Sequence, residues 1–125
     1  MGMNDLHLVG ACEAARLIRE GAITSVEVVQ ACLARVREVD GQVQAWAFLD
    51  PDYALAQARA ADEYRLSGQP IGALHGVPVG LKDIIDTADM PTENGSVLHA
   101  AARRHAMRRW CRSCAARARS SWARR

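Results

Sequence analysis

The sequence predicts an α/β fold, because segments with helical signals alternate with short apolar segments typical of strands. We expect three helices, over residues 11–20, 25–40 and 51–66, and two strand candidates, over residues 45–49 and 77–82. The chain has 125 residues, which is enough for one domain at most.

The first two helices are marked by signals at their ends. Residues 11–20 carry apolar side chains on one side and are followed by Gly21. Thr24 and Glu27 have the spacing of a capping box, in which a hydroxyl and a carboxylate three residues apart each satisfy a free backbone amide. We expect the helix that this box opens to end before Gly41. Its predicted buried stripe consists of Val26, Val29, Leu33 and Val36.

The third helix begins at Asp50-Pro51, an N-cap residue followed by a proline in the first turn. It runs to about Leu66 and ends at the Ser-Gly-Gln-Pro sequence over residues 67–70. Its high alanine content favours close helix packing.

Residues 71–86 differ in character from the helices before them. Three glycines four residues apart and Pro78 indicate a turn, and alternating Val77, Val79 and Leu81 predict a buried strand that ends near Lys82-Asp83.

The charge divides the sequence into two unlike parts. Residues 1–100 contain 7 Lys and Arg against 14 Asp and Glu, a net charge of −7, whereas residues 101–125 contain 9 Arg and no acidic residue, a net charge of +9. We therefore expect a body over residues 1–100 and a non-native Arg-rich tail over residues 101–125, disordered or irregularly helical.

Several classes of protein are excluded by the same sequence. No apolar run reaches the roughly 18 to 20 residues that a membrane span requires. The first nine residues contain no basic side chain, so they do not predict a secretory signal. The four cysteines are too unevenly spaced for a disulfide framework, and Cys111 and Cys114 form only half of a zinc site. We expect a cytoplasmic location and no metal.

Lys82 is the only lysine among 16 basic residues. A lysine can lose its proton when it is desolvated, which an arginine cannot do, so a lysine among apolar neighbours is a candidate general base. The alternative is a structural ion pair with Asp83 or Asp86.

The stretch over residues 74–87, LHGVPVGLKDIIDT, resembles the lysine segment of the amidase signature family. The capped helix, the Ala47-Phe48 pair, the alanine-rich helix and the PTENGS sequence over residues 91–96 resemble that family as well. The resemblance covers about residues 5–100. It implies the N-terminal part of a fold in which helices surround a mixed sheet.

The resemblance also implies a reaction, the hydrolysis of a small-molecule carboxamide to a carboxylate and ammonia by a Ser–cis-Ser–Lys triad. Lys82 takes the role of the base by motif match, and Asp83, Gly95 and Ser96 are supporting residues at or near the pocket. No metal or organic cofactor is implied. His75, which follows the turn, is expected to make a structural hydrogen bond.

The sequence departs from the family pattern at the two catalytic serines, which lie in a Gly/Ser-rich segment beyond the lysine. This sequence has no glycine after Gly95, and its only later Ser-Ser pair is Ser120-Ser121. We therefore expect the chain to be inactive as it stands, because a base alone supplies only part of the rate enhancement.

A shifted reading frame explains the tail. Family members commonly continue with Ala-Ala-Val-Val and then Gly-Ala-Val-Ile-Leu-Gly-Lys. Written in G/C-rich codons and read one base late, these give Arg-Arg-Trp-Cys and Ala-Arg-Ser-Ser-Trp-Ala-Arg, which are residues 108–111 and 118–124. The expected gene is therefore a frameshifted, truncated amidase.

Two alternatives stay open. Within the family, the chain could belong to the glutaminase-type component of a tRNA-dependent amidotransferase, which has partner subunits. Outside the enzymes, the nine tail arginines with Trp110 and Trp122 could form a nucleic-acid-binding arm. Such binding would also arise non-specifically from an out-of-frame tail. The sequence does not indicate an oligomeric state.

Overall fold

A computed structural model describes residues 3–87, 89–99 and 122–124. The described elements are a 3-10 helix η1 (Met3–Leu8), three α-helices, α1 (Ala11–Glu20), α2 (Ser25–Val43) and α3 (Pro51–Leu66), a strand β1 (Val79–Leu81), a 3-10 helix η2 (Val97–His99) and a strand β2 (Trp122–Arg124). The α/β prediction is confirmed. Residues 100–121, and with them most of the predicted tail, lie outside the described residues.

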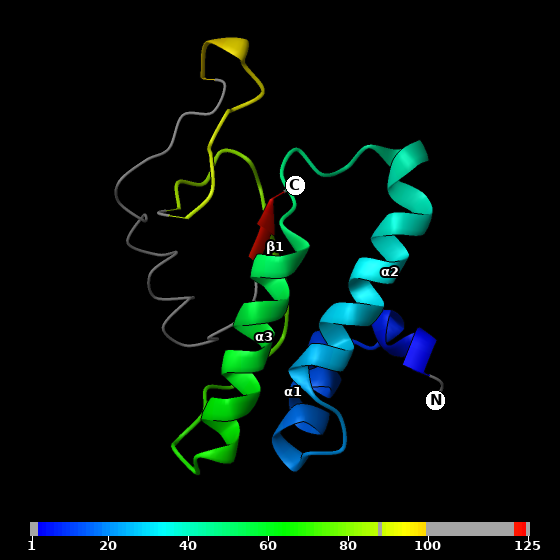
Figure 1. Ribbon diagram of the computed structural model, residues 1–125, viewed down its shortest axis with the longest axis vertical. Coiled ribbons are helices and arrows are strands. Elements are labelled where there is room, and N and C mark those ends of the chain that lie inside the picture. Colours follow the sequence, from blue (N-terminus) through cyan, green and yellow to red (C-terminus); the bar gives the residue numbers. More distant parts are fainter. Residues whose placement is uncertain (1–2, 88, 100–121, 125) are drawn as a thin grey trace.

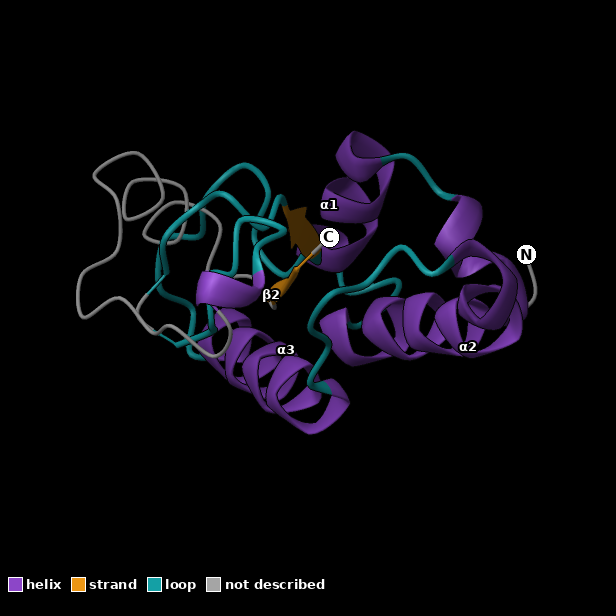
Figure 2. Cartoon of the chain, turned by 90° about the horizontal axis from the view of Figure 1, so that it is seen from above, coloured by secondary structure: helices purple, strands orange, loops and turns teal. Residues whose placement is uncertain are grey.

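Helices α2 and α3 form one layer, and α1 and the short sheet lie on one side of it (Figures 1 and 2). Helices α2 and α3 lie side by side and run in opposite directions (Figure 1). The sheet consists of β1 and β2, which pair in parallel with Gly80 opposite Ala123. The expected strand over residues 45–49 is instead an irregular segment with a single bridge residue at Phe48.

The capping box predicted at the start of α2 is present. The Thr24 hydroxyl accepts a hydrogen bond from the Glu27 amide at 3.1 Å, and the Glu27 carboxylate accepts one from the Thr24 amide at 2.7 Å. The predicted end of this helix is wrong, because α2 continues through Gly41 to Val43. The Asp40 carboxylate accepts a hydrogen bond from the Ala45 amide at 2.7 Å, which satisfies a backbone donor just beyond the helix end.

Helix α3 has the predicted bounds. Its Asp50 side chain accepts a hydrogen bond from the Tyr53 amide at 2.9 Å, and Pro51 occupies the first turn. The buried alanines of this helix allow the close packing that its composition predicts. They are Ala54, Ala58 and Ala61.

The buried apolar side chains of the described residues form three small clusters. The first joins α1 to Val28 and Val77, the second joins α2 to α3, and the third lies around Leu81 and Met90. The stripe predicted on α2 is partly correct, since Val29 and Leu33 are buried whereas Val26 and Val36 are half-buried. The segment over residues 77–82 contributes to two of these clusters, with Val77 in the first and Leu81 in the third.

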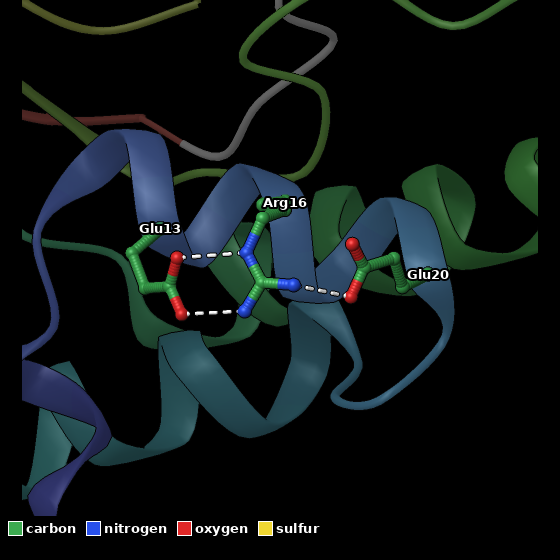
Figure 3. Close-up of polar contacts among 3 residues, drawn as sticks. All are labelled: Glu13, Arg16 and Glu20. Carbon is green, nitrogen blue, oxygen red and sulfur yellow. Dashed lines mark hydrogen bonds and ion pairs between the residues drawn. The ribbon is translucent and has the colours of Figure 1, made fainter.

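The exposed face of α1 carries an ion-pair network (Figure 3). The Arg16 guanidinium donates to both carboxylate oxygens of Glu13, at 2.7 and 2.9 Å, and to Glu20 at 2.5 Å. The hydrogen bond from Arg16 lowers the pKa of Glu13, and the two carboxylates raise the pKa of Arg16. All three side chains are about half exposed, so the network contributes little to stability.

Candidate active site

The turn that leads into β1 is fixed to the helices by His75 and Gly76. The His75 ring is 2 % exposed, and its Nε2 atom lies 2.8 Å from the carbonyl oxygen of Ala61 on α3. Its ring packs against Tyr64 with the ring centres 5.8 Å apart. The expectation of a structural hydrogen bond at His75 is confirmed.

Gly76 is required at its position for two reasons. Its φ angle is +79°, and a Cβ atom there would overlap the Ser25 hydroxyl oxygen at the start of α2. Ser25 is fully buried, so it has little freedom to move away. The loop before the lysine strand therefore contacts the N-terminal turn of α2 directly.

Lys82 follows directly after β1, as predicted. Its side chain is exposed, whereas its neighbours Leu81 and Asp83 are buried. The apolar surroundings expected for a desolvated lysine are therefore not present around Lys82 among the residues that the structure describes. Local sequence predicted apolar neighbours correctly, but the alternation along the strand directs Leu81 inward and leaves Lys82 on the opposite side.

Asp83 connects the lysine segment to the second predicted site segment. Its carboxylate Oδ1 accepts a hydrogen bond from the Glu93 amide at 3.0 Å, and its backbone carbonyl accepts one from the Asn94 amide at 3.3 Å. The side chain is only 7 % exposed. Asp83 therefore binds the backbone of the loop over residues 93–96 through hydrogen bonds.

That loop is a tight turn. The Ser96 amide donates to the Glu93 carbonyl at 3.0 Å, and both central residues have positive φ, +54° for Asn94 and +66° for Gly95. This is the pattern of a type I′ turn, and Asn-Gly is the sequence that favours it. Gly95 is exposed, and a Cβ atom there would meet only open space, so its backbone conformation is the reason for glycine.

Ser96 begins the turn into η2. Its hydroxyl accepts a hydrogen bond from the Leu98 amide at 3.3 Å, and its carbonyl accepts one from the His99 amide at 3.0 Å. The predicted site residues form two pairs of sequence neighbours, Lys82-Asp83 and Gly95-Ser96. The hydrogen bonds from the backbone amides of Glu93 and Asn94 to Asp83 connect these two pairs.

Sequence reasoning missed a second connection, between α3 and the loop that follows Lys82. The Tyr53 hydroxyl donates to the Asp89 carboxylate at 2.7 Å. Partial burial, then this hydrogen bond and the negative charges of Asp89 and Asp50, raise the pKa of Tyr53 to about 12. No local motif indicates a pair 36 residues apart, and only the folded arrangement reveals it.

Among the described residues there is no group of three or more His, Cys, Asp or Glu side chains arranged to hold a metal ion. Within the same ranges, no helix is both long enough and apolar enough to cross a membrane. The Cys111 and Cys114 pair lies outside the described residues.

The helices, the lysine that follows a parallel strand and the Gly95-Ser96 turn held to Asp83 define part of an α/β fold. The family model described as Amidase matches residues 27–106. The chain belongs to the amidase family.

Individual relatives agree with this assignment. The chain is 44 % identical over 94 residues to the "A" component of the glutamyl-tRNA(Gln) amidotransferase of Chloroflexus aggregans, a match that covers 75 % of this chain and 19 % of that protein. It is 45 % identical over 86 residues to the putative amidase AmiD of Mycobacterium bovis, covering 69 % of this chain and 18 % of the relative. The chain therefore spans about a fifth of the length of the curated relatives it matches.

A solved structure shows the same arrangement. The native peptide amidase of Stenotrophomonas maltophilia superposes with a TM-score of 0.83 at 28 % identity, covering 94 % of this chain and 24 % of that enzyme. The predicted fold class, the N-terminal part of the amidase signature fold, is confirmed.

Proposed function

We propose that this chain supplies the general base of an amidohydrolase, with Lys82 as the base. The reaction is the hydrolysis of a carboxamide to a carboxylate and ammonia or an amine. The observation that carries the proposal is the pair of hydrogen bonds from Glu93 and Asn94 to Asp83, because they hold the Gly95-Ser96 turn to the lysine segment.

In this mechanism Lys82 must be neutral when it accepts a proton. Desolvation favours the neutral amine, so the role requires that the exposed end of β1 be covered during catalysis. In a Ser–cis-Ser–Lys triad the lysine receives the proton of the nucleophilic serine through the relay serine, and the nucleophile attacks the amide carbonyl. Neither serine has a match in this sequence, so we expect the chain alone to show no amide hydrolysis above background.

A chimera tests the proposal without depending on activity of the chain alone. Residues 3–99 would replace the matching segment of the Stenotrophomonas maltophilia peptide amidase, and hydrolysis of that enzyme's own substrate would be measured. We expect an active chimera that loses at least about 100-fold in kcat when Lys82→Arg is introduced, because arginine keeps the charge but does not release its proton.

The matched control is Arg35→Lys, a change at an exposed ion pair on α2, which should leave kcat unchanged. A folded chimera in which Lys82→Arg is as active as the parent would contradict the role of Lys82. Amide hydrolysis by the unmodified chain that depends on one of its own serines would contradict both the expected inactivity and the frameshift.

The amidotransferase relative favours a second candidate function, that of a glutaminase-type component of a tRNA-dependent amidotransferase. Such a component would release ammonia from glutamine, and partner subunits would use that ammonia on a misacylated tRNA. The same chimera design, built on the Chloroflexus aggregans relative, distinguishes the two. Ammonia release from glutamine but not from simple carboxamides would favour the amidotransferase.

A further inference from the structure

The chain that follows Lys82 is held by hydrogen bonds between two of its segments, residues 83–87 and residues 89–94. Asp83 accepts the backbone amides of residues 93 and 94, as described above. Farther from β1, the Thr92 hydroxyl donates to the carbonyl oxygen of Ile85, which lies 3.5 Å away. A side-chain hydroxyl therefore makes a second link between the two segments.

The Thr92 hydroxyl is shielded from solvent. The side chain is 1 % exposed, so water does not compete freely for this group. A buried hydroxyl that lacks a partner loses its hydration without compensation, which favours keeping even a long hydrogen bond. Thr92 therefore favours the backbone conformation that keeps the Ile85 carbonyl within its reach.

Ile85 connects Thr92 to the lysine. Its amide donates to the Lys82 carbonyl at 3.0 Å and closes a turn directly after β1. Its side chain packs against the buried cluster of Leu81 and Met90. Because Ile85 is held at its carbonyl, its amide and its side chain, the backbone of Lys82 is held with it.

We propose that Thr92 is a positioning residue for Lys82 and acts through Ile85. The proposal rests on the proposed role of Lys82 as the base. A general base must lie within hydrogen-bond reach of the proton that it accepts, and a displacement of about 1 Å can lower a rate about 100-fold. Since the Lys82 side chain is exposed, the backbone of this turn sets where its amine can reach.

Thr87 offers a matched comparison in the same part of the chain. Its side chain is also 1 % exposed, and its hydroxyl accepts the Met90 amide at 3.3 Å. The Thr92 hydroxyl bonds to the residue that closes the lysine turn, whereas the Thr87 hydroxyl bonds to Met90. A general loss of stability would therefore affect Thr87→Val and Thr92→Val alike, and a loss of positioning would affect Thr92→Val.

Hydrogen exchange of the Ile85 amide in the full chain tests the connection. We expect Thr92→Val to speed this exchange at least about tenfold, because the turn opens more often. Thr92→Ser, which keeps a hydroxyl, and Thr87→Val should keep the exchange slow. If Thr92→Val does not fold, the same exchange is measured in the chimera described above. Unchanged exchange in Thr92→Val, or equal acceleration in Thr87→Val, overturns the proposal.

Kinetics of the chimera test the consequence for catalysis. Thr92→Val should lower kcat at least about tenfold with KM nearly unchanged, while Thr92→Ser and Thr87→Val stay near the parent. An unchanged kcat in Thr92→Val, in a chimera that Lys82→Arg inactivates, overturns the positioning role alone. An unchanged kcat in both Thr92→Val and Lys82→Arg contradicts the proposed function, and the positioning role is rejected with it.

Discussion

The carboxylate of Asp62 on α3 accepts a hydrogen bond from the backbone amide of Ser25 on α2 at 2.8 Å. Its second oxygen accepts the Val26 amide at 3.1 Å. Asp62 is the residue after Ala61, whose carbonyl contacts His75. One turn of α3 thus holds both the start of α2 and the loop that leads to the lysine strand.

The first prediction concerns this contact. Asp62→Ala should destabilise the chain by about 1–2 kcal/mol, because two amides of the first turn of α2 lose their acceptor at the positive end of the helix dipole. Asp62→Asn, which keeps one acceptor oxygen, should cost less. Urea unfolding followed by circular dichroism measures both, and the control Glu63→Ala at the exposed neighbour should stay within about 0.5 kcal/mol.

Two glycines give opposite predictions for the same substitution. Gly76→Ala should cost about 3 kcal/mol, because it combines a positive φ with overlap of Ser25. Gly41→Ala lies within α2 with open space around its Cβ position, so it should stabilise by about 0.5–1 kcal/mol. Equal effects of the two changes on the free energy of unfolding would contradict the close approach at Gly76.

Asp83 offers a third prediction. Asp83→Ala removes the acceptor of the Glu93 amide and should cost about 1–3 kcal/mol, since that donor loses its carboxylate acceptor. Hydrogen exchange of the Glu93 amide should become faster, whereas the Ala45 amide, which Asp40 accepts, should be unaffected. Unchanged exchange at Glu93 would mean that Asp83 does not hold the turn.

The nucleotide sequence tests the frameshift. Strand β2 pairs in parallel with β1 at residues 122–124, where the other reading frame is expected to encode Leu-Gly-Lys after Val-Ile. Absence of Val-Val and Val-Ile-Leu-Gly-Lys from the other frame would refute it.

Local signals predicted the starts of α2 and α3 well because each of these helices has a side-chain cap at its own N-terminus. The Thr24-Glu27 box and the Asp50-Pro51 pair form bonds within four residues, so their geometry follows from spacing alone. The predicted end of α2 was wrong because the Asp40 side chain accepts a hydrogen bond from the Ala45 amide, beyond Gly41.

The site was predictable only in part, because only some of its contacts join residues close together in sequence. The lysine segment and the Asn-Gly turn are local, whereas the exposure of Lys82 depends on what covers the end of β1. The contacts of Asp62 and Tyr53 join residues more than 30 positions apart, and no spacing rule encodes them.

The last prediction is a pH dependence at Tyr53. Its pKa in the folded chain is about 12, above the usual value of about 10 in an unfolded chain. The folded state therefore retains a proton that the unfolded state loses between pH 10 and pH 12. The stabilisation from this proton is fully present below about pH 10 and is lost as the pH rises toward about 12.

The unfolding free energy should therefore fall more steeply above about pH 10 for the unmodified chain than for Tyr53→Phe, which has no phenol to titrate. Asp89→Asn should also flatten this part of the profile, because it removes a negative charge that raises the Tyr53 pKa. The other titrating groups are common to all three chains and cancel in the comparison. Parallel profiles between about pH 9 and pH 11 would show that folding does not raise the pKa of Tyr53.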